Sequence, residues 1–247
     1  MQLLPALTDD PRVIAREVAA GKHLPYARHV DGVTIETREG YLMQTIRLGG
    51  LLFETADTDE LNYRAELRDA MLKSVGSSRF AVYHHMVRRK AEVALEARFA
   101  DEFSRHLDAR WRERLASREM YVNELFLTIV RRPMQGRVGL LDKFAGLLSR
   151  AVTDRTAQIA AEKRALDAAC EAMVAALGAY APRLLSVYVD ETGYRSEPLE
   201  FLSYLYNAEM RPMGLPHGDL GNHLPFRRAS FGADAFELGA AGEYERK

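Results

Sequence analysis

The sequence predicts an α+β fold, with a mixed β-sheet that begins with a hairpin and with helices packed mainly on one face. Three observations predict it: two alternating stretches joined by a short turn, a later alternation of strand-like and helix-like segments, and one long helical region over residues 139–180. Hydrophobic residues make up 47 % and charged residues 28 % of the 247 residues, which is typical of a folded soluble protein. A disordered chain is therefore excluded.

The first elements are a hairpin and a helix. Residues 33–38 and 41–48 alternate apolar and polar side chains around a Glu-Gly turn, which predicts two antiparallel strands. Asp57 stands three residues before a glutamate in the manner of a capping box, so a helix is expected from there to about Val75, with Gly76 ending it.

The middle of the chain predicts two strands around a helix. Residues 79–90 and 121–132 are rich in strand-forming side chains, and Pro133 stops the second run. The segment 98–118 between them places large apolar residues at steps of four, as expected of a helix whose apolar stripe lies on a sheet. The stripe consists of Phe99, Phe103, Leu107, Trp111 and Leu115.

The last part begins with the helical region 139–180, which is either one helix or two helices divided by a polar stretch. A strand at 183–190, a helix at 197–207 and a strand near 224–231 follow. We expect a lead-in over residues 1–30, an α+β domain over 31–207, and a loop and strand over 208–247 that lead toward a further domain.

Net charge and cysteine content exclude several classes of protein. Lys and Arg number 34 and Asp and Glu 35, so no global basic field draws the chain to nucleic acid or to an anionic membrane. The single cysteine, Cys170, excludes an internal disulfide and a multi-cysteine zinc site, and its place on an apolar stripe predicts core packing. The chain lacks the pattern of a signal peptide and any run of about 18 apolar residues, which predicts a cytoplasmic protein, soluble or peripherally attached.

Motifs for nucleotide chemistry are absent from the sequence. A phosphate-binding P-loop needs Gly-Lys-Ser/Thr after an earlier glycine, but Gly21-Lys22 is followed by His23, and Arg16 stands in the place of that glycine. Residues 184–191 end in Asp-Glu and resemble the acidic strand of a Walker B motif. Without a P-loop, we interpret them as a strand ending in an acidic turn.

Histidines give two weaker candidates. His84 and His85 are neighbours on a predicted strand, so they point to opposite faces, with one toward the core and one exposed. His217, Asp219 and His223 lie close together in a predicted loop and form either a metal site or ordinary loop polar residues. We assign no catalytic, cofactor-binding or metal-binding residue.

Basic residues end both middle strands and are the candidate partner-binding residues. They are Arg88, Arg89 and Lys90 on one strand and Arg131 and Arg132 on the other. If the strands run side by side in the same direction, the five cations gather at one sheet edge and could bind phosphate, nucleic acid or an acidic protein surface. The alternative is a solvated edge kept basic against aggregation.

Several segments resemble one protein family, in the same order along nearly the whole chain. The segments are 24–32 (LPYARHVDG), 53–64 (FETADTDELNYR), 76–89 (GSSRFAVYHHMVRR), 121–133 (YVNELFLTIVRRP) and 197–207 (EPLEFLSYLYN). They are similar to the N-terminal part of the large VirB-class ATPases of type IV secretion and conjugation systems, the TrbE/CagE/VirB family.

The resemblance implies a role in assembly. Members of the family are hexameric ATPases that carry a P-loop motor in a C-terminal domain, use ATP and Mg, and power pilus biogenesis and substrate transfer at the cytoplasmic face of the inner membrane. Their N-terminal domain contacts inner-membrane subunits, including a small bitopic pilus-assembly subunit. No motif of the motor occurs in these 247 residues, so we expect the motor domain to be absent, no catalytic residue is carried over, and residues 31–207 become an assembly domain.

Three hypotheses follow, in order of preference. The first is an assembly and docking domain of a secretion ATPase. The second is a domain of the same machine that contacts nucleic acid through the five basic residues, which the near-neutral net charge disfavours. The third is a small metal-dependent enzyme centred on His217, Asp219 and His223.

Overall fold

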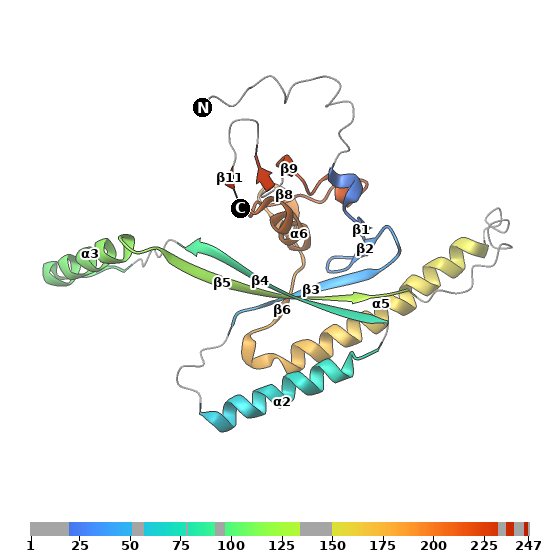
Figure 1. Cartoon of the computed structure of the whole chain (residues 1–247), viewed down its shortest axis with the longest axis horizontal. Helices are drawn as coiled ribbons and strands as arrows, with labels where there is room; N and C mark the ends of the chain where they lie inside the picture. Colours follow the sequence, from blue (N-terminus) through green and yellow to red (C-terminus); the bar gives the residue numbers. More distant parts are fainter. Residues whose placement is uncertain are drawn as a thin grey trace, which may run out of the picture.

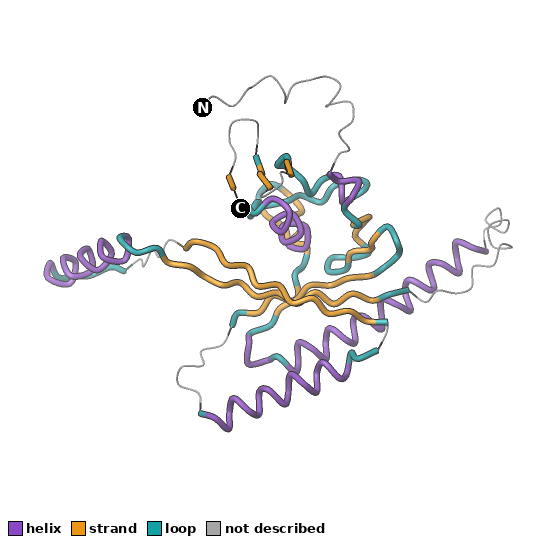
Figure 2. The backbone as a smooth tube through the Cα atoms, viewed as in Figure 1, coloured by secondary structure: helices purple, strands orange, loops and turns teal. Residues whose placement is uncertain are grey.

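A six-stranded sheet runs through the middle of the protein (Figures 1 and 2). The computed structural model describes residues 20–50, 57–77, 79–91, 97–133, 150–231, 236–239 and 245–246. The strand order is β1-β2-β3-β5-β4, with β6 also paired to β3, and every described pair is antiparallel. The strands are β1 (Tyr26–His29), β2 (Ile35–Thr37), β3 (Leu42–Leu48), β4 (Phe80–Ala91), β5 (Met120–Arg131) and β6 (Arg183–Leu184).

The predicted hairpin is confirmed as β2 and β3. Ile35 pairs with Met43 across it, and Gly40 in its turn has a φ of 80°, a left-handed conformation that glycine adopts without a steric penalty. β1 adds one strand beyond β2 from within the segment expected to be a lead-in. β3 pairs with β5 along its full length, from Leu42 opposite Arg131 to Leu48 opposite Leu125.

Two long helices cover one face of the sheet, as Figure 1 shows below the strands. They are α2 (Thr58–Ser74), which the Asp57 carboxylate caps by accepting from the Glu60 amide as predicted, and α5 (Arg150–Ala176). α5 places Leu166, Cys170 and Met173 in a core with the sheet residue Ile46. The start of the helical region expected at 139–180 lies outside the described residues up to 149.

A third helix, α6 (Glu197–Asn207), lies on the opposite face, so the helices are not confined to one side. The Ser196 hydroxyl caps it by accepting from the Leu199 amide, and Ala208 ends it in a left-handed conformation. The rings of Phe201 on α6 and Phe126 on β5 pack 4.4 Å apart and anchor a second core. Apolar side chains of β3 and β5 therefore point into cores on both faces.

A two-stranded arm extends the sheet on one side. β4 and β5 pair over twelve residues each, but β3 accompanies β5 only as far as Leu125, so the remaining rungs have two strands. At the end of this ribbon stands α3 (Glu102–Ala116), which Figure 1 shows apart from the other helices. The Asp101 carboxylate caps α3 by accepting from the Ser104 amide.

The strand expected at 183–190 is wrong in one respect, because the structure divides it. β6 pairs with β3, whereas β7 (Val187–Asp190) pairs with β8 (Gly193–Ser196) in a separate hairpin. Between them the Leu185 amide donates to Thr45 and the Val187 amide to Gly32, so the chain leaves the sheet at this point. A small three-stranded sheet near the C-terminus contains β9 (Ala229–Phe231), β10 (Phe236–Leu238) and β11 (Glu245–Arg246), and the short helical turns are η2 (Ala20–His23), η3 (Gly178–Tyr180) and η4 (Leu220–Asn222).

Candidate partner-binding surface

The five predicted basic residues do not gather at one edge. β4 and β5 are neighbours but antiparallel, so Arg89 faces Val122, nine residues along β5 from Arg131. At roughly 3.3 Å per residue, the two groups stand about 30 Å apart along the ribbon. The condition of parallel strands, on which a single cluster depended, is not met.

The group on β4 lies on the two-stranded arm and is exposed. The Arg88 guanidinium lies 4.5 Å from the centre of the Tyr121 ring, and Lys90 Nζ is 2.9 Å from Glu119 Oε1. The hydrogen bond from Lys90, followed by one from Tyr121, lowers the pKa of the Glu119 carboxyl. These contacts keep the cations on the arm surface, where a partner can reach them.

In the group on β5, Arg131 is paired within the domain and Arg132 is exposed. Arg131 donates through Nε to Glu162 Oε2 at 2.8 Å, and Arg79 donates to the other oxygen of the same carboxylate. Burial acts to raise the pKa of Glu162, but hydrogen bonds from the two arginines outweigh it and the pKa is lowered. Arg131 is thus committed to joining β5 and α5, while Arg132 is exposed with its guanidinium 5.9 Å from the Tyr41 ring centre.

A different basic cluster forms at the base of the arm, and sequence reasoning missed it. Arg47 on β3, Arg89 on β4 and Arg183 on β6 border one open hollow of about 350 Å³. Arg47 and Arg89 both donate to the buried Glu124 carboxylate, and Arg183 makes a bidentate pair with Glu197 at 2.7 Å. Only the sheet pairing brings these arginines together, so no spacing in the sequence predicts the cluster.

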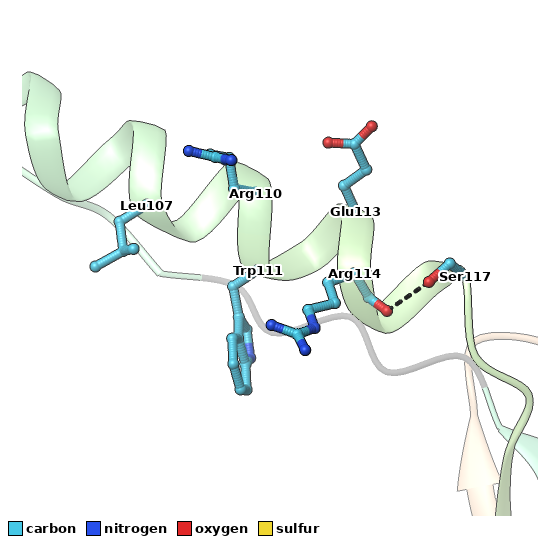
Figure 3. Close-up of a pocket in the computed structure, with 6 residues that line it drawn as sticks. All are labelled: Leu107, Arg110, Trp111, Glu113, Arg114 and Ser117. Carbon is cyan, nitrogen blue, oxygen red and sulfur yellow. Dashed lines mark hydrogen bonds between the residues drawn. The ribbon is translucent and has the colours of Figure 1, made fainter.

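The apolar stripe of α3 contradicts the expectation that it lies on a sheet. No residue of α3 is buried over its whole length, and Phe103, Leu107 and Trp111 are 78 %, 60 % and 55 % exposed. The reason is its position, because α3 stands beyond the end of β3, at the end of a ribbon two strands wide. Figure 3 shows the side chains of Leu107, Trp111 and Arg114 on the same side of the helix, with Glu113 on the opposite side.

The histidine pair on β4 behaves as predicted. His85 is half-buried, with its ring 5.2 Å from Phe201 in an edge-on contact, while His84 is exposed. Burial, with a further contribution from His84, lowers the pKa of His85. The two rings therefore point to opposite faces and do not form a shared site.

The loop candidates for a metal have structural partners. Asp219 caps η4 by accepting from the Gly221 amide and pairs with Arg38 at 2.7 Å. Within the part of the chain that the structure describes, no three His, Cys, Asp or Glu side chains are placed to hold a metal ion. These observations favour the interpretation of His217, Asp219 and His223 as loop polar residues.

Two further sequence features have structural roles. Asp190 lies at the turn of the β7–β8 hairpin, where hydrogen bonds from Thr192 and then Arg195 lower the pKa of its carboxyl to about 2. Cys170 is fully buried in the core under the sheet, and burial raises the pKa of its thiol to about 12, which removes its nucleophilic character at neutral pH. The predictions of an acidic turn and of a core cysteine are confirmed.

Comparison with known proteins decides the family. Residues 33–138, which contain β2 to β5 and the whole arm, match the N-terminal domain of the type IV secretion system ATPase VirB4/TrbE. These residues form a VirB4/TrbE N-terminal domain. The family that the sequence resemblance indicated is thereby confirmed.

Curated relatives extend the similarity beyond the matched domain. The chain is 28 % identical over 226 residues to the type IV secretion system protein VirB4 of Bartonella quintana, covering 92 % of this chain and 29 % of the relative. It is 30 % identical over 233 residues to the PtlC homologue of Bordetella bronchiseptica, covering 91 % and 28 %. Brucella suis VirB4 is 28 % identical over 225 residues, covering 88 % and 27 %. The chain thus spans less than a third of the length of these relatives.

The VirB4/TrbE family implies ATP and Mg, and the Gly21-Lys22 turn of this chain does not fit the phosphates of ATP. At the Gly-Lys pair, the carbonyl groups of Gly21 and Lys22 accept hydrogen bonds from Arg38. A side chain at Gly21 would meet the Gly221 carbonyl at 2.6 Å, so this turn is filled by protein and offers no cradle for a phosphate. Among the described helices, none has both the length and the apolar content that a bilayer crossing needs.

Proposed function

We propose that this chain is the assembly and docking domain of a type IV secretion ATPase and that it contacts inner-membrane subunits of the secretion system. A small bitopic pilus-assembly subunit is among the proposed partners. The observation that carries the proposal is the arm, which lies inside the segment matched by the VirB4/TrbE domain and presents apolar and basic side chains that the fold itself does not bury. Surfaces of this kind mark protein or membrane contact sites.

The role of the full-length ATPase is part of the same proposal. A hexamer at the cytoplasmic face of the inner membrane binds ATP with Mg. Hydrolysis of this ATP energises pilus biogenesis and conjugative or effector transfer. The present chain supplies the contacts that hold the motor on the membrane complex. We therefore expect the purified chain alone to show no ATP turnover, and measurable turnover contradicts this division of roles.

The experiment is capture of the small inner-membrane subunit by the chain from detergent extracts that contain the secretion system. Replacing the exposed cations of the arm with Arg88→Gln and Lys90→Gln is expected to weaken capture about tenfold, because rim charges favour encounter with an acidic surface. Arg68→Gln with Lys73→Gln on α2 removes the same charge elsewhere and serves as the matched control. Equal capture by both variants contradicts a docking role for the β4 group.

A second candidate function is contact with nucleic acid, and the hollow of Arg47, Arg89 and Arg183 favours it. Two observations weigh against it, because Glu124 and Glu197 already pair with these arginines and the net charge is −1. This function requires salt-dependent binding of single-stranded or duplex DNA, with an affinity that falls as counterions are added. Absence of a mobility shift at low salt excludes it.

A further inference from the structure

The exposed face of α3 combines apolar and basic residues. Phe103, Leu107 and Trp111 recur every four residues and form a ridge along one side of the helix. Arg110 and Arg114 follow Leu107 and Trp111 by three residues each, so both begin next to the ridge. Figure 3 shows the Arg114 side chain on the side of Trp111, and the exposed Arg110 side chain extending toward the other side of the helix. Phe103 is the most exposed of the three apolar side chains, which places the ridge on the solvent side of the helix.

The two arginines beside the ridge are available to an external anion. Among the described residues, no acidic side chain pairs with Arg110 or Arg114. In contrast, Arg112 toward the other side of α3 donates through Nε to Asp108 Oδ2 at 2.6 Å and is half-buried. The cations whose charge is compensated within α3 are thus separated from those that stand next to the exposed apolar side chains.

The shape of this surface suits a lipid layer better than a folded partner. The described residues that line the hollow in Figure 3 all come from α3 and the residue that follows it, so no other described element supplies an opposing wall. A folded partner would have to supply the whole groove for such a helix. An interfacial helix needs only an apolar side, basic residues beside it and access to the surface, and its aromatic rings sit at the headgroup level.

The position of α3 gives it that access. The ribbon of β4 and β5 carries the helix beyond the rest of the sheet, as Figure 1 shows. The base of the arm adds Met86 and the arm itself adds Tyr121, which are 62 % and 49 % exposed. A helix held at the end of an arm can lie on a plane without a collision with the bulk of the domain.

We infer that α3 is an interfacial helix that binds an anionic phospholipid surface, with Phe103, Leu107 and Trp111 inserted among the headgroups and Arg110 and Arg114 on the lipid phosphates. This inference deepens the proposed function and rests on it for the location at a membrane. The arm then acts as a spacer that sets the distance between the lipid surface and the sheet.

The test uses the whole chain and its own fluorescence. Trp111 is the single tryptophan of the sequence, so its emission reports on α3 without any labelling. Vesicles with 30 % phosphatidylglycerol in phosphatidylcholine are expected to shift the emission of Trp111 to shorter wavelength and to sediment the protein. Vesicles of phosphatidylcholine alone should bind at least tenfold more weakly, and added salt should weaken the binding to the anionic vesicles because their surface charge is screened.

Variants test whether the exposed face of α3 is responsible for vesicle binding and for the spectral shift. Arg110→Gln with Arg114→Gln should reduce vesicle binding about tenfold, and Phe103→Ser with Leu107→Ser should abolish the spectral shift. The pair Arg68→Gln and Lys73→Gln on α2 removes two charges from another helix and should bind like the unaltered chain. All the altered side chains are exposed, so the fold should survive each change.

Three outcomes overturn the inference. The first is no spectral shift with anionic vesicles. The second is an equal loss of binding in the α2 control, which reports only net charge. The third is a spectral shift that depends on protein concentration in the absence of vesicles. Such a shift would mean that this face of α3 binds a second copy of the chain. Capture of the inner-membrane subunit, measured in parallel, separates the inferences: intact capture without lipid binding refutes the lipid site alone, whereas lost capture with intact lipid binding refutes the proposed docking function.

Discussion

Two of the described helices, α3 before β5 and α5 after it in the chain, differ in how far their apolar side chains are buried. α5 follows β5, packs against β3 and β5 and buries Leu166, Cys170 and Met173. α3 precedes β5, repeats apolar residues with similar spacing and buries no residue along its length. The difference lies in what stands opposite each helix, because only α5 has a broad sheet surface to cover. An apolar stripe therefore indicates that the helix packs against another surface, and that surface need not belong to the same chain.

The largest expected loss of stability is seen when one leucine from each helix is replaced. Leu166→Ala leaves a cavity at a fully buried site and should reduce the free energy of unfolding by about 2–5 kcal/mol. Leu107→Ala removes the same atoms from an exposed site and should change it by less than about 0.5 kcal/mol. Urea unfolding followed by circular dichroism measures both. Equal losses would mean that α3 is packed in solution and that the comparison is wrong.

The next effect concerns the charged link between α5 and the sheet. Glu162→Gln leaves Arg79 and Arg131 without their shared carboxylate and should cost about 3 kcal/mol of stability. Folding lowers the pKa of Glu162. Its contribution to the free energy of unfolding is therefore fully present above the pKa of the unfolded state, near 4.5, and is lost as the pH falls through the pKa of the folded state.

Unfolding curves between pH 3 and pH 7 test this link. The unaltered chain should lose more stability than the Glu162→Gln variant as the pH falls below about 4.5. Glu113→Gln on the exposed side of α3 is the control and should leave the pH profile unchanged. Parallel profiles for all three proteins would show that the triad contributes no acid sensitivity.

A smaller effect concerns the segment that covers α6. Asn207 is fully buried, its amide nitrogen donates to the Leu224 carbonyl, and its oxygen accepts from the Phe226 and Arg227 amides. Asn207→Ala leaves the Phe226 and Arg227 amides without their acceptor, while the Leu224 carbonyl keeps the Ser203 hydroxyl, and should cost about 1–3 kcal/mol in thermal or urea unfolding. Asn62→Ala on the exposed side of α2 should be nearly neutral, and a similar cost for both would refute the bridging role.

The smallest effect is confined to the arm. Asp101→Ala removes the cap of α3 and should fray its first turn, since the Ser104 amide loses its acceptor. Hydrogen exchange should become faster at Ser104 and its neighbours while the amides of β3 and β5 keep their protection. Faster exchange throughout the sheet would mean that α3 and the sheet form one cooperative unit.

Local patterns were sufficient for most elements and for several side-chain roles. The alternation in 33–48 predicted the β2–β3 hairpin, Asp57 predicted the start of α2, and the stretch 197–207 predicted α6 with its bounds. These features depend on contacts between residues close in sequence, namely turn geometry, helix caps and the spacing of apolar side chains. The core position of Cys170 followed from the same periodicity.

The candidate surfaces depended on contacts between residues far apart in sequence. Arg89 and Arg131 both end strands, but the antiparallel direction of β4 and β5, which alternation alone does not encode, sends them to opposite ends. The hollow of Arg47, Arg89 and Arg183 exists only because β6, β3, β5 and β4 lie side by side in that order, although they are far apart in the sequence.

The sequence by itself determined the elements of this VirB4/TrbE domain, the faces along which they are apolar, and its family. The tertiary structure alone decided which apolar face became core and which stayed outside, because burial depends on the strands that stand opposite a helix. For α5 these are β3 and β5, and for α3 the third strand is missing. The exposed ridge of Phe103, Leu107 and Trp111 is the consequence of that difference.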